Sequence, residues 1–281
     1  MELLALCWVL LAGTLLSTSA ASSALQEGDL GPIMKQMDMA LNSFDDQYEG
    51  CEVSMWDEIE EVNHTEFSRN SFYADTWKKA AKEWQKRCRR PADCPQLRPE
   101  QAIAVLAYTA ASRMCARFNA ATRQGGRTHE DYLHSYHFKT LHFLLTQALL
   151  DLRASQPRCY YVYRGVRGIR FMARRGMSVR FGQFTSSSRS KKATEKFGQD
   201  TLFVMKTCYG VPIKQLSFIE EEDEVLIPPF EVFEVTNFSN VNGRTKIRLR
   251  SKEKMSTHNC ELLKPLGGQW GRGHQEVGLG L

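Results

Sequence analysis

The sequence predicts an α+β protein in which an N-terminal helical part packs on a β-rich C-terminal core. Apolar residues recur at helical spacing in the first half, and near Gln156 the pattern changes to short β-rich runs between glycine and polar turns. Helices followed by strands are typical of α+β proteins and not of alternating parallel sheets. The chain has no Gly-x-Gly-x-x-Gly after a strand, so a nucleotide held in the Rossmann manner is not expected.

The expected elements follow in chain order. Pro99 suits the first position of a helix, and Asn242-Gly243 is a hairpin signal. The helices are predicted over residues 33–44, 75–88, 99–118 and 129–152. The strands are predicted over residues 159–163, 179–184, 201–207, 225–235 and 246–249.

Both ends of the chain carry information about its compartment. Residues 1–22 are typical of a cleaved secretory signal, with an apolar stretch shorter than the ~20 residues that span a bilayer. Residues 23–265 are expected to form one domain. Residues 266–281 are polar and glycine-rich, so we expect a flexible tail and not the hydrophobic end of a lipid anchor. The sequence therefore predicts a secreted, extracellular protein without a membrane anchor.

The cysteines and sequons agree with an extracellular compartment. Removing Cys7 with the signal leaves seven of the eight cysteines, so one is expected to stay free or to pair between molecules. Cys115, in a helical run, is the expected free thiol. No Cys/His spacing resembles a zinc site, and no metal is expected. Asn63 and Asn237 lie in glycosylation sequons.

Charge is unevenly distributed in this chain of net charge +5. Residues 152–194 contain no Asp or Glu but many Arg and Lys, whereas residues 220–224 are all acidic. A basic block can bind a polyanion such as nucleic acid or glycosaminoglycan. Strand-like patterning and a single acidic block downstream favour a phosphate-bearing ligand between the two, so nucleic acid is not the expected partner.

The acidic run ends abruptly at Val225-Leu226-Ile227. If the run is extended, alternation places Glu220, Glu222 and Glu224 on one face. Two such carboxylates suit an enzyme that stabilises an oxocarbenium-like centre and orients a cationic acceptor. The alternative is a solvated acidic turn before a strand.

Two further segments carry a family resemblance. One strand-like run ends at Arg164-Gly165, and another ends in the hydroxyls of residues 185–188. An arginine, a serine cluster and Glu-x-Glu, in this order and each at a strand end, resemble the Arg–Ser–Glu signature of arginine-specific mono-ADP-ribosyltransferases. The resemblance covers residues 29–264. It is greatest to the vertebrate ecto-enzymes and, among them, to the secreted member, ecto-ADP-ribosyltransferase five.

The resemblance implies a fold of split sheets, an expected monomer, and NAD as a consumed substrate and not a redox cofactor. The nicotinamide–ribose bond breaks, and ADP-ribose passes to an arginine of an acceptor protein. If water arrives first, the enzyme is an NAD glycohydrolase. The alternative is a secreted protein that keeps the fold without catalysis and binds glycosaminoglycan through its basic block.

The resemblance also implies roles for single residues. Arg164 would bind the NAD phosphates, and Ser186 would hold Glu224 and the ribose. Glu224 would stabilise the oxocarbenium, while Glu222 would orient and deprotonate the acceptor guanidinium. The pair Glu220 and Glu222 is a second possible frame, which the junction with the apolar strand disfavours.

Further positions follow from the same resemblance. Gln183, Ser217 and Tyr108 match positions that contact NAD. The implied disulfides are Cys51–Cys260 and Cys159–Cys208, and Cys88–Cys94 is a third candidate pair.

Overall fold

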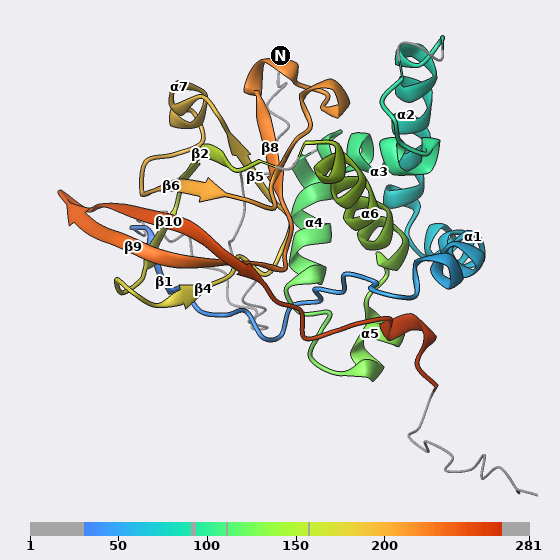
Figure 1. The fold of residues 1–281 in the computed structure, drawn as a ribbon, viewed down its shortest axis with the longest axis horizontal. Coiled ribbons are helices and arrows are strands. Elements are labelled where there is room, and N and C mark those ends of the chain that lie inside the picture. The colour runs from blue at the N-terminus through green and yellow to red at the C-terminus, as the bar shows by residue number, and fades with distance from the viewer. Residues whose placement is uncertain (1–30, 91–93, 111, 157, 266–281) are drawn as a thin grey trace, which may run out of the picture.

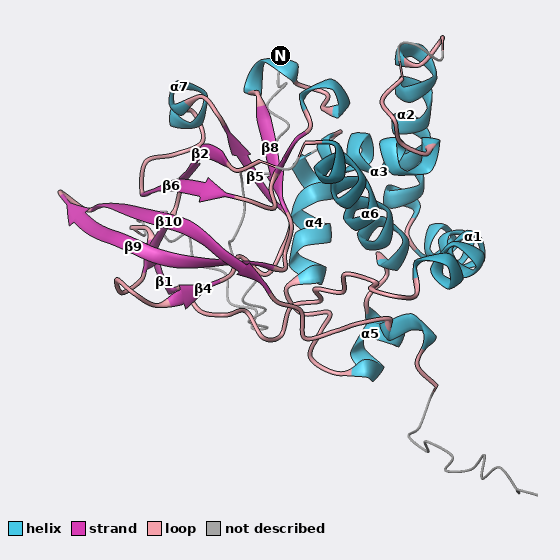
Figure 2. Ribbon diagram, in the orientation of Figure 1, coloured by secondary structure: helices cyan, strands magenta, loops and turns pink. Residues whose placement is uncertain are grey.

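The structure is a computed structural model that describes residues 31–90, 94–110, 112–156 and 158–265. The expected signal peptide and C-terminal tail lie outside these residues. Helices gather on one side of the molecule and strands on the other (Figures 1 and 2). The predicted α+β architecture, with the helical part packed on a β-rich core, is therefore confirmed.

The predicted helix over residues 75–88 is confirmed, whereas the predicted helices 99–118 and 129–152 are each divided into two. Pro99 is the first residue of a helix, as predicted. The helices of the helical part are α1 Glu52–Arg69, α2 Ser71–Arg87, α3 Pro99–Thr109, α4 Ser112–Thr122, α5 His129–Ser135 and α6 Lys139–Ser155. The helix α1 was not predicted, because its many acidic residues leave few apolar positions at helical spacing. Among the described residues, no helix is both long and apolar enough to cross a membrane.

The predicted helix over residues 33–44 is wrong. Ile33–Gln36 form the strand β1, which pairs in parallel with β3 (Ile169–Met172). Met37 is then buried in the core beside the sheet, while Phe44 is buried in the core among the helices. This segment crosses from one core to the other, which a single helix could not do.

The strands form two sheets within the described part of the chain. One holds β1 and β3, and the other holds eight strands in the order β4-β9-β10-β6-β2-β5-β8-β7. The strands of this larger sheet are β2 Tyr160–Val166, β4 Ser178–Val179, β5 Thr185–Ser188, β6 Thr201–Thr207, β7 Val211–Pro212, β8 Glu224–Ile227, β9 Glu231–Val241 and β10 Arg244–Lys254. Asn242 and Gly243, both with positive φ, turn β9 into β10 as the hairpin signal predicts.

The larger sheet opens between β2 and β5. β2 pairs with β6 along its whole length, but its register with β5 has one pair, Tyr163 with Ser188. β5 in turn pairs fully with β8, from Thr185–Ile227 to Ser188–Glu224. The sheet therefore consists of two halves joined at one point, which agrees with the expected split sheets. The short helix α7 (Lys191–Glu195) follows β5 beside this opening (Figure 1).

Apolar packing fixes the strand β8 from both sides. Val225 and Ile227 are buried in the core beside the sheet, and Leu226 is buried in the helical core. The predicted strand 225–235 is interrupted at Pro228 and Pro229, since proline has no N–H for a sheet ladder. A strand buried on both faces holds the residue at its beginning, Glu224, in a fixed position.

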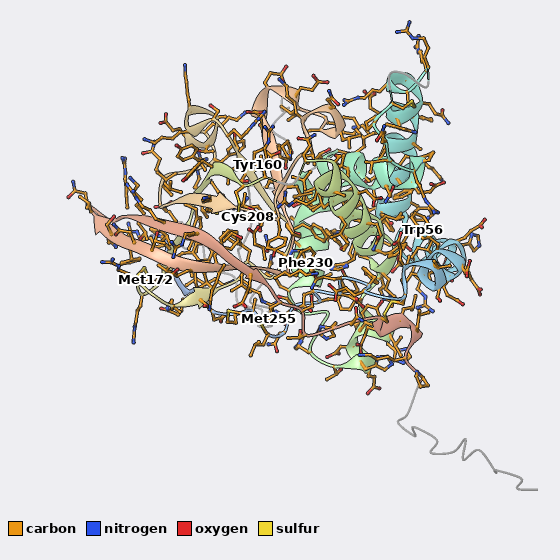
Figure 3. The ribbon with its side chains drawn as sticks, viewed as in Figure 1. Trp56, Tyr160, Met172, Cys208, Phe230 and Met255 are labelled. Atoms are coloured by element: carbon orange, nitrogen blue, oxygen red, sulfur yellow. A yellow bond between two sulfur atoms is a disulfide. The ribbon has the colours of Figure 1, made fainter. Side chains whose placement is uncertain are left out.

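Disulfides join distant parts of the chain. Cys51–Cys260 links the start of α1 to the C-terminal segment across 209 residues. Cys159–Cys208 joins the segments next to β2 and β6, and Cys208 lies near Tyr160 of β2 (Figure 3). Cys88–Cys94 closes a short loop. All three predicted pairs are confirmed.

The expected free thiol at Cys115 is wrong. Cys115 is disulfide-bonded, and no described cysteine is free. The prediction depended on removing Cys7 with the expected signal peptide, which left an odd number of cysteines.

Buried Arg180 anchors the N-terminal segment to the rest of the molecule. Its guanidinium forms an ion pair with Asp45, and both side chains are fully buried. The same guanidinium donates to the carbonyls of Met39, at 2.7 Å, and Met255, at 2.9 Å. The segment that follows β1 and the end of β10 are thereby held together.

Candidate active site

The acidic run does not form an extended ladder. Glu220–Glu222 form a short 3-10 helix, and Asp223 adopts the left-handed conformation with a φ of 46°. Strand pairing begins only at Glu224. The prediction of an extended segment is therefore wrong, because the chain must turn to enter β8. The alternative of an acidic turn is right for the backbone, but Glu222 and Glu224 are buried and not solvated.

Glu224 lies at the start of β8 with its side chain fully buried. Burial raises the pKa of Glu224 to about 7, and the neighbouring charge of Glu222 adds to this shift. The hydroxyls of Ser186 and Ser217 and the guanidinium of Arg164 partly offset it. Ser217 Oγ donates to Oε2 of Glu224 at 3.3 Å. The carboxyl can therefore change charge near neutral pH.

Glu222 lies beside Glu224 and meets a cation from another element. Its Oε1 is 2.7 Å from Nζ of Lys196, the residue that ends α7. Ser188 Oγ donates to the backbone carbonyl of Glu222 at 2.6 Å and so fixes the turn against β5. Glu220, by contrast, is mostly exposed and 4.0 Å from Arg87. The structure therefore brings Glu222 and Glu224 together and leaves Glu220 aside.

Arg164 projects from β2 into the opening of the sheet. Its Nη1 donates to the carbonyl of Ser186 at 2.7 Å. Burial lowers the pKa of Arg164 to about 10, and the nearby groups of Tyr108 and Glu224 partly oppose this effect. At this pKa the guanidinium still carries its charge at neutral pH. Arg164, Ser186 and Glu224 therefore meet at one place, as the signature predicts.

The three serines of β5 are not equivalent. Ser187 Oγ donates to the carbonyl of Val225 at 2.7 Å, and Ser188 Oγ donates to the turn at Glu222. Ser186 Oγ is buried and has no hydrogen-bond partner of good geometry among the described residues. It lies beside Tyr108 and Glu224 and influences the pKa of both. Ser186 is thus the serine whose hydroxyl is not committed to the backbone.

Tyr108 supports the site from α3. Its hydroxyl donates to the carbonyl of Phe184 at 3.1 Å, just before β5. Asn119 of α4 donates to the same carbonyl at 3.0 Å and to the Tyr108 hydroxyl at 3.3 Å. Burial raises the pKa of Tyr108. Sequence reasoning missed Asn119, since an Asn within a helical run carries no signal of such a contact.

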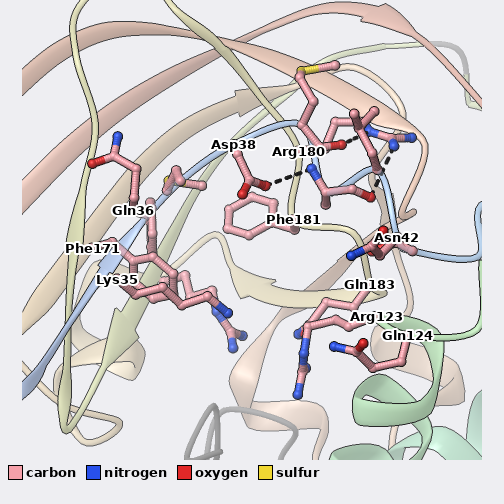
Figure 4. A pocket seen from close by; sticks show the side chains of 17 residues that line it. Lys35, Gln36, Asp38, Asn42, Arg123, Gln124, Phe171, Arg180, Phe181 and Gln183 are labelled. Atoms are coloured by element: carbon pink, nitrogen blue, oxygen red, sulfur yellow. Dashed lines mark hydrogen bonds between the residues drawn. The ribbon is translucent and has the colours of Figure 1, made fainter. Parts of the chain in front are cut away.

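A pocket of about 510 Å³ adjoins these residues. Figure 4 shows Lys35 on one side of the pocket and Asn42, Gln183 and Arg123 on the other. Arg164 also lines the pocket, whereas Glu222, Glu224, Ser186 and Ser217 do not. The pocket and the carboxylates therefore meet at Arg164. Three aromatic side chains also line it, Phe171, Phe181 and Phe203.

Several cationic side chains line this pocket, among them Lys35, Arg123 and Arg164. Burial lowers the pKa of Arg123 and also that of Lys35, whose pKa is lowered further by Arg123 and raised by Asp38. Arg123 in turn lowers the pKa of Arg164. Nη1 of Arg123 donates to Oε1 of Gln183. Neither Lys35 nor Arg123 was singled out in the sequence, because they lie far from the motifs along the chain.

The remaining predicted residues lie away from this site. Asn63 is half-buried within α1, where Tyr73 Oη donates to its Oδ1 at 3.5 Å. Asn237 is exposed on β9. Within the described ranges, no group of three His, Cys, Asp or Glu side chains could hold a metal ion.

Known proteins share this chain's sequence and fold. Residues 37–257 match the family of NAD:arginine ADP-ribosyltransferases. The chain is 76% identical to NAD(P)(+)–arginine ADP-ribosyltransferase 1 of Gallus gallus, over 100% of this chain and 90% of the relative. It is 46% identical to the GPI-linked NAD(P)(+)–arginine ADP-ribosyltransferase 1 of Homo sapiens, over 90% and 82%. A crystal structure of a mutant of the eukaryotic mono-ADP-ribosyltransferase ART2.2 in complex with NAD matches with a TM-score of 0.70 and 36% identity, over 82% of this chain and 99% of that one.

The member of the family that the sequence was expected to resemble most is not the most similar one among these relatives. Ecto-ADP-ribosyltransferase 5 of Bos taurus is 37% identical over 85% of this chain and 81% of its own length, well below the avian relative. The chain is thus nearer to the avian enzyme than to the expected secreted member. The family itself is confirmed: this chain belongs to the NAD:arginine ADP-ribosyltransferases.

Proposed function

We propose that this chain cleaves the nicotinamide–ribose bond of NAD at Glu224 and passes ADP-ribose to an acceptor arginine held by Glu222. The observation that carries the proposal is the buried carboxylate pair beside Arg164 and Ser186, at the edge of a cationic pocket. NAD is consumed in this reaction and is not regenerated as a cofactor would be. Nicotinamide leaves as the second product.

The pocket would bind the phosphates of NAD. Lys35, Arg123 and Arg164 line it, while Arg180 is already neutralised by Asp45. Burial lowers the pKa of all three cations, and the charge of Arg123 lowers those of Lys35 and Arg164 further. A pyrophosphate would relieve this repulsion, and guanidinium groups match phosphate geometry. The volume of about 510 Å³ lies within the usual range of ligand pockets.

Glu224 would stabilise the positive charge that develops on the ribose as nicotinamide leaves. Its ionised form is required, and a cation beside it favours that form. The uncommitted hydroxyl of Ser186 could donate to this carboxylate and to the ribose, while Ser217 already donates to Oε2. Gln183 would contact NAD from the pocket wall. Tyr108, whose hydroxyl is bonded to the backbone, would position β5.

Glu222 would bind the acceptor guanidinium and remove its proton during attack. A guanidinium is otherwise protonated at every pH of interest, so transfer needs a second carboxylate. Hydrolysis needs only the oxocarbenium and a water molecule. The same site would therefore act as an NAD glycohydrolase whenever water arrives before arginine.

The test is to incubate the purified protein with labelled NAD and an arginine analogue, and to measure free nicotinamide and the guanidine adduct. Glu224→Gln is expected to lose both products. Glu222→Gln is expected to lose the adduct and keep nicotinamide release. Glu220→Gln is the matched control, because Glu220 is mostly exposed on the same turn. Nicotinamide release by the Glu224 variant, or equal loss of both products in the Glu222 variant, would contradict the assigned roles.

A non-catalytic polyanion-binding protein is the weaker candidate. Two arginines of the basic block, Arg164 and Arg180, are buried and serve the site and the fold instead of a surface. Binding to a polyanion would also weaken steeply with salt. NAD turnover that persists at about 0.5 M salt would separate the two functions.

We also propose that the protein acts outside the cytosol and is secreted. The three disulfides support this proposal, since disulfides persist in oxidising compartments. The human relative is described as GPI-linked, so a lipid anchor is the alternative to free secretion. Expression in animal cells separates the two: a secreted protein collects in the medium, while a lipid-anchored one stays on cells until a phosphatidylinositol-specific phospholipase releases it.

A further inference from the structure

Lys196 reaches from the surface to a buried carboxylate of the site. Its Nζ lies 2.7 Å from Oε1 of Glu222. The side chain of Lys196 is 44% exposed, whereas that of Glu222 is 3% exposed. The ion pair therefore joins a solvated cation to an anion that has lost nearly all of its water.

The backbone around α7 is closely packed, and this packing fixes the position of the Lys196 backbone. A Cβ atom on Gly165 would lie 2.5 Å from the carbonyl of Thr194 and 2.6 Å from that of Gly198. Gly198 itself has a φ of +126°, which favours glycine. Ser190 caps α7 by accepting from the N–H of Ala193 at 3.3 Å. The turn that carries Lys196 is thus packed against Gly165, the residue after Arg164.

The ion pair with Lys196 affects whether Glu222 is ionised. Within the described part of the chain, the charge of Arg164 acts on buried Glu224, and Lys196 pairs with buried Glu222. A buried carboxylate next to a like charge takes up a proton when its cation is removed. A protonated Glu222 could neither attract a guanidinium nor accept its proton.

Three other cations on nearby described elements are either paired with other carboxylates or exposed. Arg189, after β5, is paired with Asp223. Arg87 of α2 contacts Glu83 at 2.8 Å and lies 4.0 Å from Glu220. Lys214, on the neighbouring 3-10 helix Lys214–Leu216, is exposed. Among these groups, Lys196 is the cation that contacts the Glu222 carboxylate.

We propose that Lys196 is the positioning residue that keeps Glu222 ionised and so directs ADP-ribose to arginine instead of water. This inference rests on the proposed role of Glu222 as the acceptor carboxylate. A carboxylate offers about four acceptor sites, so it can hold the ammonium and an incoming guanidinium together. Lys196 itself need not touch NAD or the acceptor.

The inference predicts opposite changes in two pH profiles. In Lys196→Gln, Glu222 should ionise only at higher pH, so the acid limb of arginine transfer moves up by about one pH unit or more. Nicotinamide release without acceptor should move the other way. A neutral Glu222 no longer repels the charge of Glu224, so Glu224 ionises at lower pH. A purely structural defect would lower both activities without separating their pH dependence.

The experiment measures both products from about pH 5.5 to about pH 9.5 for the wild type, Lys196→Gln and Lys196→Arg. Lys192→Gln is the matched control, because Lys192 is exposed on the same helix. On the acid limb of the wild-type profile, transfer by Lys196→Gln should fall about tenfold for a shift of about one pH unit, and it should recover at high pH. Lys196→Arg should retain most of the transfer activity, because it keeps the cation.

Each outcome bears on one of the two proposals. Unchanged profiles in Lys196→Gln, or limbs that move together, would overturn the inference about Lys196. Glu222→Gln is measured in parallel. If Glu222→Gln retains transfer, the proposed acceptor role of Glu222 fails. If Glu222→Gln loses transfer while Lys196→Gln behaves as wild type, only the inference about Lys196 fails. Thermal unfolding of each variant shows whether it is folded, and Lys196→Arg supplies the test if Lys196→Gln is not.

Discussion

Replacing Glu224 by Gln should stabilise the fold while removing activity. Glu224 is fully buried, and burial raises its pKa from 4.5 to about 7. Because the folded-state pKa is the higher one, the folded protein binds this proton more tightly than the unfolded chain does. The stability that comes from the proton is fully present below pH 4.5 and is lost as the pH rises through about 7. Gln is always neutral and avoids this loss.

The size of the effect follows from the two pKa values. Each pKa unit corresponds to about 1.4 kcal/mol. The ionisable side chain therefore lowers the free energy of unfolding by about 3 kcal/mol at pH 8, by about 2 kcal/mol at pH 6, and by almost nothing at pH 4. For a domain of this size, about 3 kcal/mol corresponds to an increase in Tm of about 6–12 °C. The Ser217 hydroxyl can still donate to a Gln oxygen at this position.

The assay is denaturant unfolding of the wild type and Glu224→Gln at pH 4, 6 and 8 with the disulfides intact. Glu231→Gln is the control, because Glu231 is also buried with a raised pKa but lies outside the site. Its Oε1 accepts from the N–H groups of Cys208, at 2.8 Å, and Tyr209, at 3.3 Å, and Thr207 donates to Oε2. An amide there loses an acceptor, so no stabilisation is expected. A Glu224 variant that is less stable at pH 8, or whose gain does not grow with pH, would refute the reasoning.

Three further variants test other parts of the structure. Arg180→Met removes the guanidinium that pairs with the buried carboxylate of Asp45, so the free energy of unfolding should fall by about 3–5 kcal/mol. A fall below about 1 kcal/mol in urea unfolding would contradict this. The double change Cys51→Ser and Cys260→Ser opens a loop of 209 residues and should lower stability by up to about 5 kcal/mol in the entropic model, and an unchanged Tm would argue against it. Tyr108→Phe removes one of two donors to the Phe184 carbonyl and should lower stability by about 1 kcal/mol. Its NAD cleavage should change only a few-fold, and a loss above about 100-fold would indicate direct contact with NAD.

The sequence alone determined the class of fold and the order of the motifs. The change from helical to β-rich patterning near Gln156 predicts the two parts of the molecule, because each periodicity suits one kind of secondary structure. The family resemblance supplied Arg164, the serine cluster and the paired carboxylates. It also supplied the pairs Cys51–Cys260 and Cys159–Cys208, both present in the structure.

Predictions from local sequence patterns were wrong for segments whose conformation depends on contacts with residues far away in the sequence. Residues 33–44 have helical spacing but cross from one core to the other, so burial at both ends outweighs helix propensity. The acidic run alternates in sequence but turns at Asp223, because strand pairing starts only at Glu224. Neither contact could be seen from neighbouring residues.

The tertiary structure decided which members of the motifs can act together. Three adjacent serines look alike in sequence, yet Ser187 and Ser188 are bonded to backbone carbonyls and Ser186 is not. Arg123 and Lys196 come from segments without a motif and reach the site only through packing. The charge state of buried carboxylates depends on such neighbours, and the fold alone brings them within a few ångströms.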